Sequence, residues 1–204
     1  MLCLKVPTDR AWAAIAMSDV DAVLVDHAQC ELKAASNALS LAARHPGDTE
    51  LVFALTDLAR EEIDHFQRVV AALTARGLAC EAPTEDHYAA ELRRAVAALA
   101  HDPTFSPLVD RLLVCALIEA RSCERFKLLA EAAGEKGDAI ATLWRELIAS
   151  EAQHYTTFVD LAVRAAGGNR ALTVERLDRL ADVEGAIVSA LHSKSAEARA
   201  AIHG

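Results

Sequence analysis

Two copies of Glu-x-x-His, each with a further Glu upstream, are the residues with the clearest chemistry in this sequence. They are Glu31, Glu62 and His65 in the first set, and Glu119, Glu151 and His154 in the second. The upstream Glu precedes its copy by 31 residues in the first set and by 32 in the second, and the paired Glu and His recur after 89 residues. Four carboxylates and two imidazoles in this order are typical of a carboxylate-bridged di-metal site inside a four-helix bundle.

The six residues fall on the apolar faces of predicted helices. In residues 49–76, Glu62 and His65 are in helical step with Leu55 and Leu58. The other three segments place their carboxylates in apolar stripes in the same way. An ionised carboxylate alone in an apolar interior is unfavourable by several kcal/mol, and four would repel one another, so we expect two divalent cations between them. Oxygen and nitrogen donors without thiolate favour two iron ions, ahead of manganese.

The elements that must position these residues are helices. The chain is rich in Ala and Leu and contains only 8 Gly and 5 Pro among 204 residues. We predict bundle helices over about 18–44, 49–76, 106–133 and 138–166, and accessory helices over about 84–100 and 173–201. Short loops within each pair and a long crossover between the pairs predict an all-α, ferritin-like four-helix bundle. The crossover would contain the extra helix, the C-terminal helix would pack on the bundle, and residues 1–204 would form a single domain.

Composition excludes several classes of protein. The net charge of −9 argues against non-specific binding to nucleic acid, because such binding requires Lys and Arg to neutralise phosphates. The five cysteines are scattered and form no Cys-x-x-Cys pair, which argues against a rubredoxin-like iron site or a zinc ribbon. No signal peptide and no apolar run of membrane-spanning length is evident. Free thiols agree with a cytoplasmic location.

Three neighbours of the predicted ligands need separate consideration. Glu124 is the rival of Glu119 as the ligand on the third bundle helix, but its spacing to Glu151 is 27 residues and breaks the symmetry of the two sets. His27 lies one turn before Glu31 on the inward side, where a pocket residue or a residue that supports the ligand is expected. Cys115 holds the matching place before Glu119, and we interpret it as core lining.

Four segments that contain the predicted ligands resemble the MiaE family, the tRNA 2-methylthio-N6-isopentenyladenosine hydroxylases. They are residues 26–35 (DHAQCELKAA), 60–66 (REEIDHF), 118–126 (IEARSCERF) and 150–155 (SEAQHY). The resemblance covers roughly residues 5 to 200. It implies an O2-dependent di-iron monooxygenase of the ferritin-like superfamily that hydroxylates the isopentenyl side chain of a modified adenosine in tRNA.

The resemblance also implies roles for the residues. Glu31, Glu62 and His65 would serve one iron, and Glu119, Glu151 and His154 the other, with no catalytic residue beyond these metal ligands. Partners would be the tRNA anticodon stem-loop and an external electron-donating reductase, for a protein that is a monomer or a dimer. The residues predicted to contact substrate are His27, Arg121 and Arg125. Further basic candidates are Lys5, Arg10, Arg93, Arg94 and Lys127. Surface ion pairing of Arg121 and Arg125 with Glu124 and Glu131 is the competing interpretation.

Three other functions use a similar set of ligands. One is a ferritin-like iron-oxidising or iron-binding protein, which would require assembly into a shell. Another is a rubrerythrin-like peroxidase, which the missing Cys-x-x-Cys site makes a weaker interpretation. The third, the radical-bearing subunit of ribonucleotide reductase, needs a Tyr close to the metals. Tyr88 is expected in the crossover and Tyr155 is expected to point away from the metals, so neither suits that role.

Overall fold

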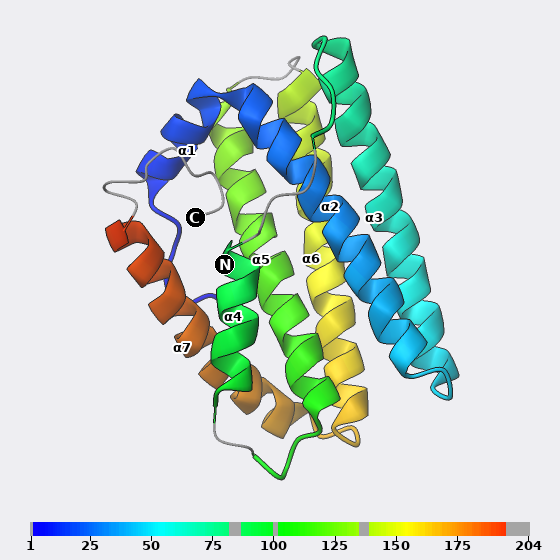
Figure 1. Cartoon of the computed structure of the whole chain (residues 1–204). Coiled ribbons are helices and arrows are strands. Elements are labelled where there is room, and N and C mark those ends of the chain that lie inside the picture. Colours follow the sequence, from blue (N-terminus) through cyan, green and yellow to red (C-terminus); the bar gives the residue numbers. More distant parts are fainter. Residues whose placement is uncertain (1, 82–86, 100–101, 135–138, 195–204) are drawn as a thin grey trace. The chain divides into compact units, whose positions relative to one another are not determined.

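The computed structural model of the chain describes residues 2–81, 87–99, 102–134 and 139–194 (Figure 1). Within these residues there are seven helices and no strand, which confirms the all-α prediction. The helices are α1 (Arg10–Ser18), α2 (Val20–Arg44), α3 (Thr49–Ala75), α4 (His87–Ala97), α5 (Pro107–Ala132), α6 (Ala139–Ala165) and α7 (Arg170–Lys194).

The chain divides into two compact units, which are described separately. Unit 2 comprises Ala16–Glu85 and contains α2 and α3. Unit 1 comprises Met1–Ile15 together with Asp86–Gly204 and contains α4, α5, α6 and α7. Each unit therefore holds one of the two predicted ligand sets, and the expectation of a single domain stays a prediction.

Unit 2 is an antiparallel helical hairpin. Asp19 caps α2 by accepting a hydrogen bond from the backbone N–H of Ala22, and Asp48 caps α3 in the same way. The predicted start of the first bundle helix, at about residue 18, is too early, because Ser18 ends a separate short helix, α1, that was not predicted. Gly77 follows the end of α3. It has φ of 76°, and the backbone N–H groups of Gly77 and Leu78 bond back to the last turn in a Schellman motif.

Unit 1 is built on α5 and α6, which lie side by side along most of their length (Figure 1). Phe126 of α5 stacks on the fully buried Trp144 of α6, with ring centroids 5.5 Å apart. The C-terminal helix α7 packs on α4, α5 and α6, as predicted for a helix that covers the bundle. Arg176 of α7 makes a two-pronged ion pair with Asp110 of α5, at 2.8 and 2.7 Å.

The predicted bounds of the four long helices agree with the structure to within two residues. The last helix begins at Arg170 and not at 173, because the Asn169 side chain accepts a hydrogen bond from the N–H of Leu172 and starts the helix earlier. The crossover helix α4 is shorter than the predicted 84–100 among the described residues. The predicted bounds at 84, 100, 138 and 201 lie outside the described residues.

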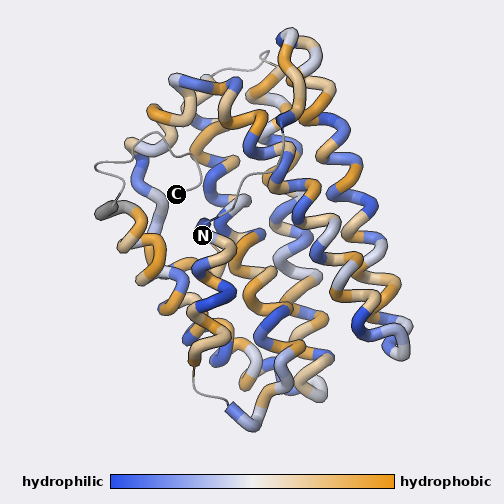
Figure 2. The backbone as a smooth tube through the Cα atoms, in the orientation of Figure 1, coloured by the Kyte–Doolittle hydropathy of each residue, from blue (hydrophilic) through white to orange (hydrophobic). Residues whose placement is uncertain are grey.

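Figure 2 shows apolar and hydrophilic residues alternating along the helices, as expected for helices that bury one face and expose the other. Within the described part of the chain, no helix combines the length and the continuous apolar character that crossing a lipid bilayer would require.

Candidate metal centre

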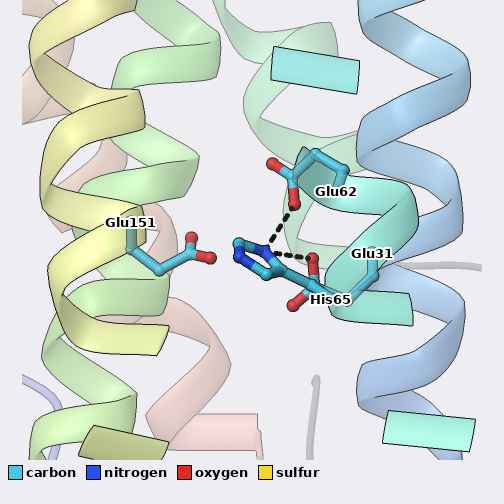
Figure 3. A group of neighbouring side chains, drawn as sticks. All are labelled: Glu31, Glu62, His65 and Glu151. Atoms are coloured by element: carbon cyan, nitrogen blue, oxygen red, sulfur yellow. Dashed lines mark hydrogen bonds and ion pairs between the residues drawn. The ribbon is translucent and has the colours of Figure 1, made fainter. Parts of the chain in front are cut away.

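The first predicted ligand set lies together inside unit 2. Glu31 comes from α2, and Glu62 and His65 come from adjacent turns of α3 (Figure 3). Their donor atoms all lie within 4.8 Å of one another, and each side chain is buried. His65 Nδ1 lies 3.4 Å from Glu62 Oε2 and 3.6 Å from Glu31 Oε2. The i, i+3 spacing on α3 is what brings Glu62 and His65 to the same side of that helix.

The electrostatics of this set show how strongly it attracts positive charge. Burial alone would lower the pKa of His65, but the nearby Glu31 and Glu62 carboxylates outweigh burial and raise that pKa to about 10. Burial would raise the pKa of Glu31, yet His27 and His65 hold it well below its usual range. The Glu31 carboxylate is therefore ionised and requires a cation beside it, which is a protonated imidazole or a metal ion.

His27 supports this set from the same helix as Glu31. Its Nε2 lies 2.8 Å from Glu31 Oε1, and both side chains are buried. Metal-binding side chains are commonly oriented by a polar contact of this kind with a neighbouring residue. The placement of His27 against Glu31 favours support of a ligand over contact with substrate.

The second predicted set lies inside unit 1. Glu119 comes from α5, and Glu151 and His154 come from α6 at the same i, i+3 spacing as in the first set. All three side chains are buried. The donor atoms of Glu119 and His154 lie within 4.8 Å of each other. The sequence placed these three residues on the apolar faces of their helices, and the structure shows that these faces are buried.

Both sets fit a divalent metal ion by the chemistry of their donors. Each consists of two carboxylates and one imidazole, all buried, and contains no thiolate. Hard oxygen donors with imidazole suit iron or manganese, and a buried carboxylate pair gains most from a cation that removes its repulsion.

The rival ligand Glu124 is engaged elsewhere in unit 1. Its carboxylate accepts two hydrogen bonds from the backbone N–H of Thr8, at 3.2 Å each, and one from the Thr8 hydroxyl at 2.7 Å. It also forms an ion pair with Arg121. These bonds account for its burial without a metal, so the structure favours Glu119 as the ligand on α5.

Arg121 is buried in unit 1 and not on its surface. Its side chain is 1% exposed and lies between Glu124 and the fully buried Glu184 of α7. The guanidinium contacts Glu184 at 2.7 to 2.9 Å and donates to the backbone carbonyl of Val6 at 2.9 Å. The Tyr88 hydroxyl also donates to Glu184, at 2.9 Å. This placement gives Arg121 a structural role and does not present it to a phosphate.

Arg125 is half-buried and lies against two aromatic rings. Its guanidinium carbon is 5.3 Å from the ring centroid of Trp12 and 5.7 Å from that of Tyr88. Such cation–π contacts join the N-terminal residues and α4 to α5. The competing interpretation is confirmed in part for Arg121, which forms the expected ion pair with Glu124, but this pair is buried and does not lie on the surface.

Glu184 is a buried acid that the sequence analysis missed. It recurs at helical spacing with apolar residues of α7. The ligands were predicted because they lie on apolar helix faces in the same way, so this pattern could also have identified Glu184. The apolar members of this stripe are Leu177, Leu180, Val188 and Leu191. The partner that neutralises it, Arg121, is 63 residues away in the chain and left no local signal.

A cavity of about 330 Å³ lies in unit 1. Residues of the N-terminal segment, α6 and α7 line it, among them Cys3, Tyr155, Val159, Val174 and Leu177. Tyr155 directly follows the predicted ligand His154 and lines this cavity together with Cys3. The sequence-based expectation that Tyr155 is not directed at the metal ligands agrees with this placement.

Comparison with known proteins gives one family and two curated relatives. The family model "tRNA-(MS[2]IO[6]A)-hydroxylase (MiaE)" matches residues 1–197. A Pseudomonas putida protein named tRNA 2-(methylsulfanyl)-N(6)-isopentenyladenosine(37) hydroxylase is 41% identical, over 78% of this chain and 74% of the relative. A Salmonella typhimurium protein of the same name is 29% identical, with the same coverage of each chain.

A solved structure supports the fold. It is described as Protein 43 with aldehyde deformylating oxygenase activity from Synechococcus, and it matches with a TM-score of 0.79 and 38% identity, covering 90% of this chain and 88% of that chain. Together with the helix order, this match shows that the fold is ferritin-like, as predicted.

Proposed function

The chain belongs to the MiaE family of tRNA hydroxylases, and from this premise we propose that it hydroxylates the isopentenyl side chain of 2-(methylsulfanyl)-N6-isopentenyladenosine in tRNA. The reaction class is an O2-dependent monooxygenation. A ferritin-like iron-storage role and a rubrerythrin-like peroxidase role are not favoured, because the family match extends over nearly the whole chain and the curated relatives carry the hydroxylase name.

The observation that carries the proposal is the pair of buried Glu, Glu, His sets, one in each unit. We propose that Glu31, Glu62 and His65 hold one iron ion and that Glu119, Glu151 and His154 hold a second. The pKa of His65, raised to about 10 by two carboxylates, supports this assignment, because a set that retains a proton so strongly also attracts a metal cation.

The chemistry that iron supplies there when bound is activation of O2 for insertion of one oxygen atom into a C–H bond, with electrons from an external reductase. The chain itself contributes orientation and exclusion of water. His27 lies 2.8 Å from the Glu31 carboxylate, and we propose that this contact fixes the direction of the carboxylate. The burial of all six ligands keeps bulk water from them.

Recognition of tRNA must come from a limited set of cations, because the protein is acidic overall. Arg10, Arg94 and Lys127 are exposed in unit 1, whereas Arg121 is committed to buried carboxylates. We propose that exposed cations of this kind contact the anticodon stem-loop and that base stacking contributes more than total charge. A cytoplasmic location follows from a tRNA substrate.

The decisive experiment is the nucleoside profile of tRNA from cells with and without this protein. We expect the hydroxylated nucleoside to be absent without the gene and to return when the gene is supplied. The matched control is a gene carrying Glu62→Ala, which should restore the protein but not the nucleoside. With purified, iron-loaded protein, a reductant and O2, the modified adenosine should gain the mass of one oxygen atom. Unchanged nucleoside masses would refute the proposal.

A second candidate substrate deserves a direct comparison. The Synechococcus protein of similar structure is described as having aldehyde deformylating oxygenase activity. The same purified protein should therefore be incubated with a long-chain aldehyde under identical conditions. We expect turnover of tRNA and none of the aldehyde, since the curated relative at 41% identity is a tRNA hydroxylase. Aldehyde turnover without tRNA turnover would assign the chain to the other reaction.

A further inference from the structure

The N-terminal residues Cys3–Thr8 run across α5, α6 and α7 of unit 1, and we call them the strap. Lys5 forms an ion pair with Asp178 of α7. Val6 packs so closely on α7 that a methyl group added at Gly185 would lie only 3.0 Å from Val6 Cγ2. Because Gly185 has no side chain, Val6 of the strap can pack directly against the backbone of α7 at this position.

One end of the strap is bound to α5 through buried polar groups. The backbone carbonyl of Val6 accepts a hydrogen bond from Arg121 at 2.9 Å. The Thr8 hydroxyl accepts from Arg121 at 3.0 Å and donates to Glu124 at 2.7 Å, so it bridges the two charged groups. The backbone N–H of Thr8 bonds to the same carboxylate. All these groups on Thr8, Arg121 and Glu124 are buried.

The other end of the strap lies against α6. Cys3 of the strap and Tyr155 of α6 line the same cavity, and burial raises the pKa of the Cys3 thiol above its ordinary value. The thiol therefore remains neutral and acts as a packing group.

Both attachment points lie next to proposed metal ligands in the sequence. Arg121 follows Glu119 by two residues, and Tyr155 directly follows His154. Two residues of an α-helix correspond to a rotation of about 200°, so Arg121 and Glu119 project from opposite sides of α5. A bond to Arg121 consequently restrains the rotation of α5 about its own axis, and that rotation sets the direction of Glu119.

We propose that the strap is a positioning element for the metal ligands of unit 1, and that Arg121 is its main positioning residue. The strap holds the back of α5 and one side of α6 at the level of Glu119 and His154. Ligand side chains need support to within about 0.5 Å to hold a metal well, and the strap supplies that support. This inference rests on the proposed assignment of Glu119, Glu151 and His154 as ligands.

The test is the rate at which the iron-loaded protein releases iron to a chelator, measured well below the melting temperature of every variant. Thr8→Val removes the hydroxyl bridge and preserves the side-chain shape. Arg121→Lys keeps the charge but cannot make the forked contacts of a guanidinium. We expect both variants to release iron about tenfold to a hundredfold faster, the range typical when a residue supporting a metal ligand is lost.

Arg176→Gln is the matched control. It breaks a buried ion pair between the same two helices, α5 and α7, but its partner Asp110 lies more than two helical turns before Glu119. We expect this variant to lower the melting temperature about as much as Arg121→Lys and to leave the iron release rate at the wild-type value. Equal acceleration in the control and in the strap variants would reduce the strap to a merely structural role and overturn the proposal.

A second comparison avoids the buried charges altogether, in case Arg121→Lys does not fold. Gly185→Ala should displace the strap through Val6 and speed iron release. In a chain that also carries Val6→Ala, the added methyl group has room, and Gly185→Ala should leave iron release unchanged relative to Val6→Ala alone.

Two further outcomes are decisive. Wild-type iron retention in folded Gly185→Ala and Thr8→Val proteins would overturn the inference and leave the proposed function intact. A wild-type protein that binds no iron at all would remove the proposed function and the inference together.

Discussion

Two buried clusters in this protein each combine two carboxylates with one basic side chain, and we propose that only one of them binds a metal ion. In unit 2, Glu31 and Glu62 surround His65, and in unit 1, Glu124 and Glu184 surround Arg121. Each cluster is therefore two carboxylates with one base. Imidazole can lose its proton and become a metal ligand, whereas guanidinium keeps its charge and cannot. The difference teaches that the identity of the base, and not the number of buried acids, separates a metal site from an internal salt bridge.

The largest expected effect concerns the ligands. Replacing Glu62 or His154 by Ala should abolish iron binding by the set to which the residue belongs, because each change removes one of three buried donors. The helical fold should survive, since the apolar stripes remain. Metal analysis and circular dichroism of the purified variants measure both quantities. Full iron occupancy in either variant would contradict the ligand assignment for that unit.

We expect substitutions in the cluster of Arg121, Glu124 and Glu184, the salt-bridge cluster, to lower the stability of the protein. Glu184→Ala leaves the buried Arg121 with one carboxylate in place of two, and the loss of a partner from a buried ion pair typically destabilises by about 3 to 5 kcal/mol. Denaturant unfolding of the wild-type and variant proteins measures this loss. A change below about 1 kcal/mol, the value of a surface pair, would show that the cluster is more solvated than its burial indicates.

A smaller effect should distinguish the residues that precede the two upstream ligands. His27 contacts the Glu31 carboxylate, and its counterpart one turn before Glu119 is Cys115, whose thiol is only a weak hydrogen-bond donor. His27→Gln should weaken iron binding by about tenfold to a hundredfold, and Cys115→Ser should change it much less. Iron titrations of both variants measure this difference. Equal losses of iron affinity would mean that His27 and Cys115 support the neighbouring ligands to the same extent.

The smallest effect is a pH dependence that belongs to the salt-bridge cluster. Burial, followed by the Glu184 charge, raises the pKa of Tyr88 well above its usual value of 10. The folded state thus holds the phenol proton more tightly than the unfolded state. The corresponding stability is present below about pH 10 and is lost as the pH rises beyond it.

Tyr155→Phe makes Tyr88 the only tyrosine of the chain, so that its ionisation can be followed alone by absorbance near 295 nm. We expect no ionisation near pH 10 in the folded variant, and ionisation together with unfolding at higher pH. A reversible titration centred near pH 10 in the folded protein would show that Tyr88 is exposed to solvent.

The periodic features of the sequence were sufficient to predict the long helices. The i, i+3 and i, i+4 recurrences around Glu62 and Glu151 predicted both the helices and the burial of these acids. The family resemblance rested on the same segments. The helix α1 was missed because it is short, and its separation from α2 depends on a cap at Asp19 instead of on periodicity.

The stripe criterion has a limit that Glu184 makes clear. Glu184 lies on an apolar face just as the ligands do, yet its burial is explained by Arg121 and Tyr88. A stripe indicates that an acid is buried, but not which cation neutralises it. The repeat of two similar sets distinguishes the proposed ligands from Glu184, because a structural ion pair has no reason to recur at a matched spacing.

The sequence by itself determined which residue types are available for a metal site, their order, the helices that carry them and the family, because helical periodicity is local and needs only neighbours along the chain. The tertiary structure alone decided that Glu124 binds the strap, that Arg121 is buried and that Tyr155 meets Cys3. Those pairings join positions far apart in the chain, and a contact between distant residues leaves no periodic trace in one sequence. Burial then sets their chemistry, since the same Arg that would attract phosphate at a surface neutralises two carboxylates in a core.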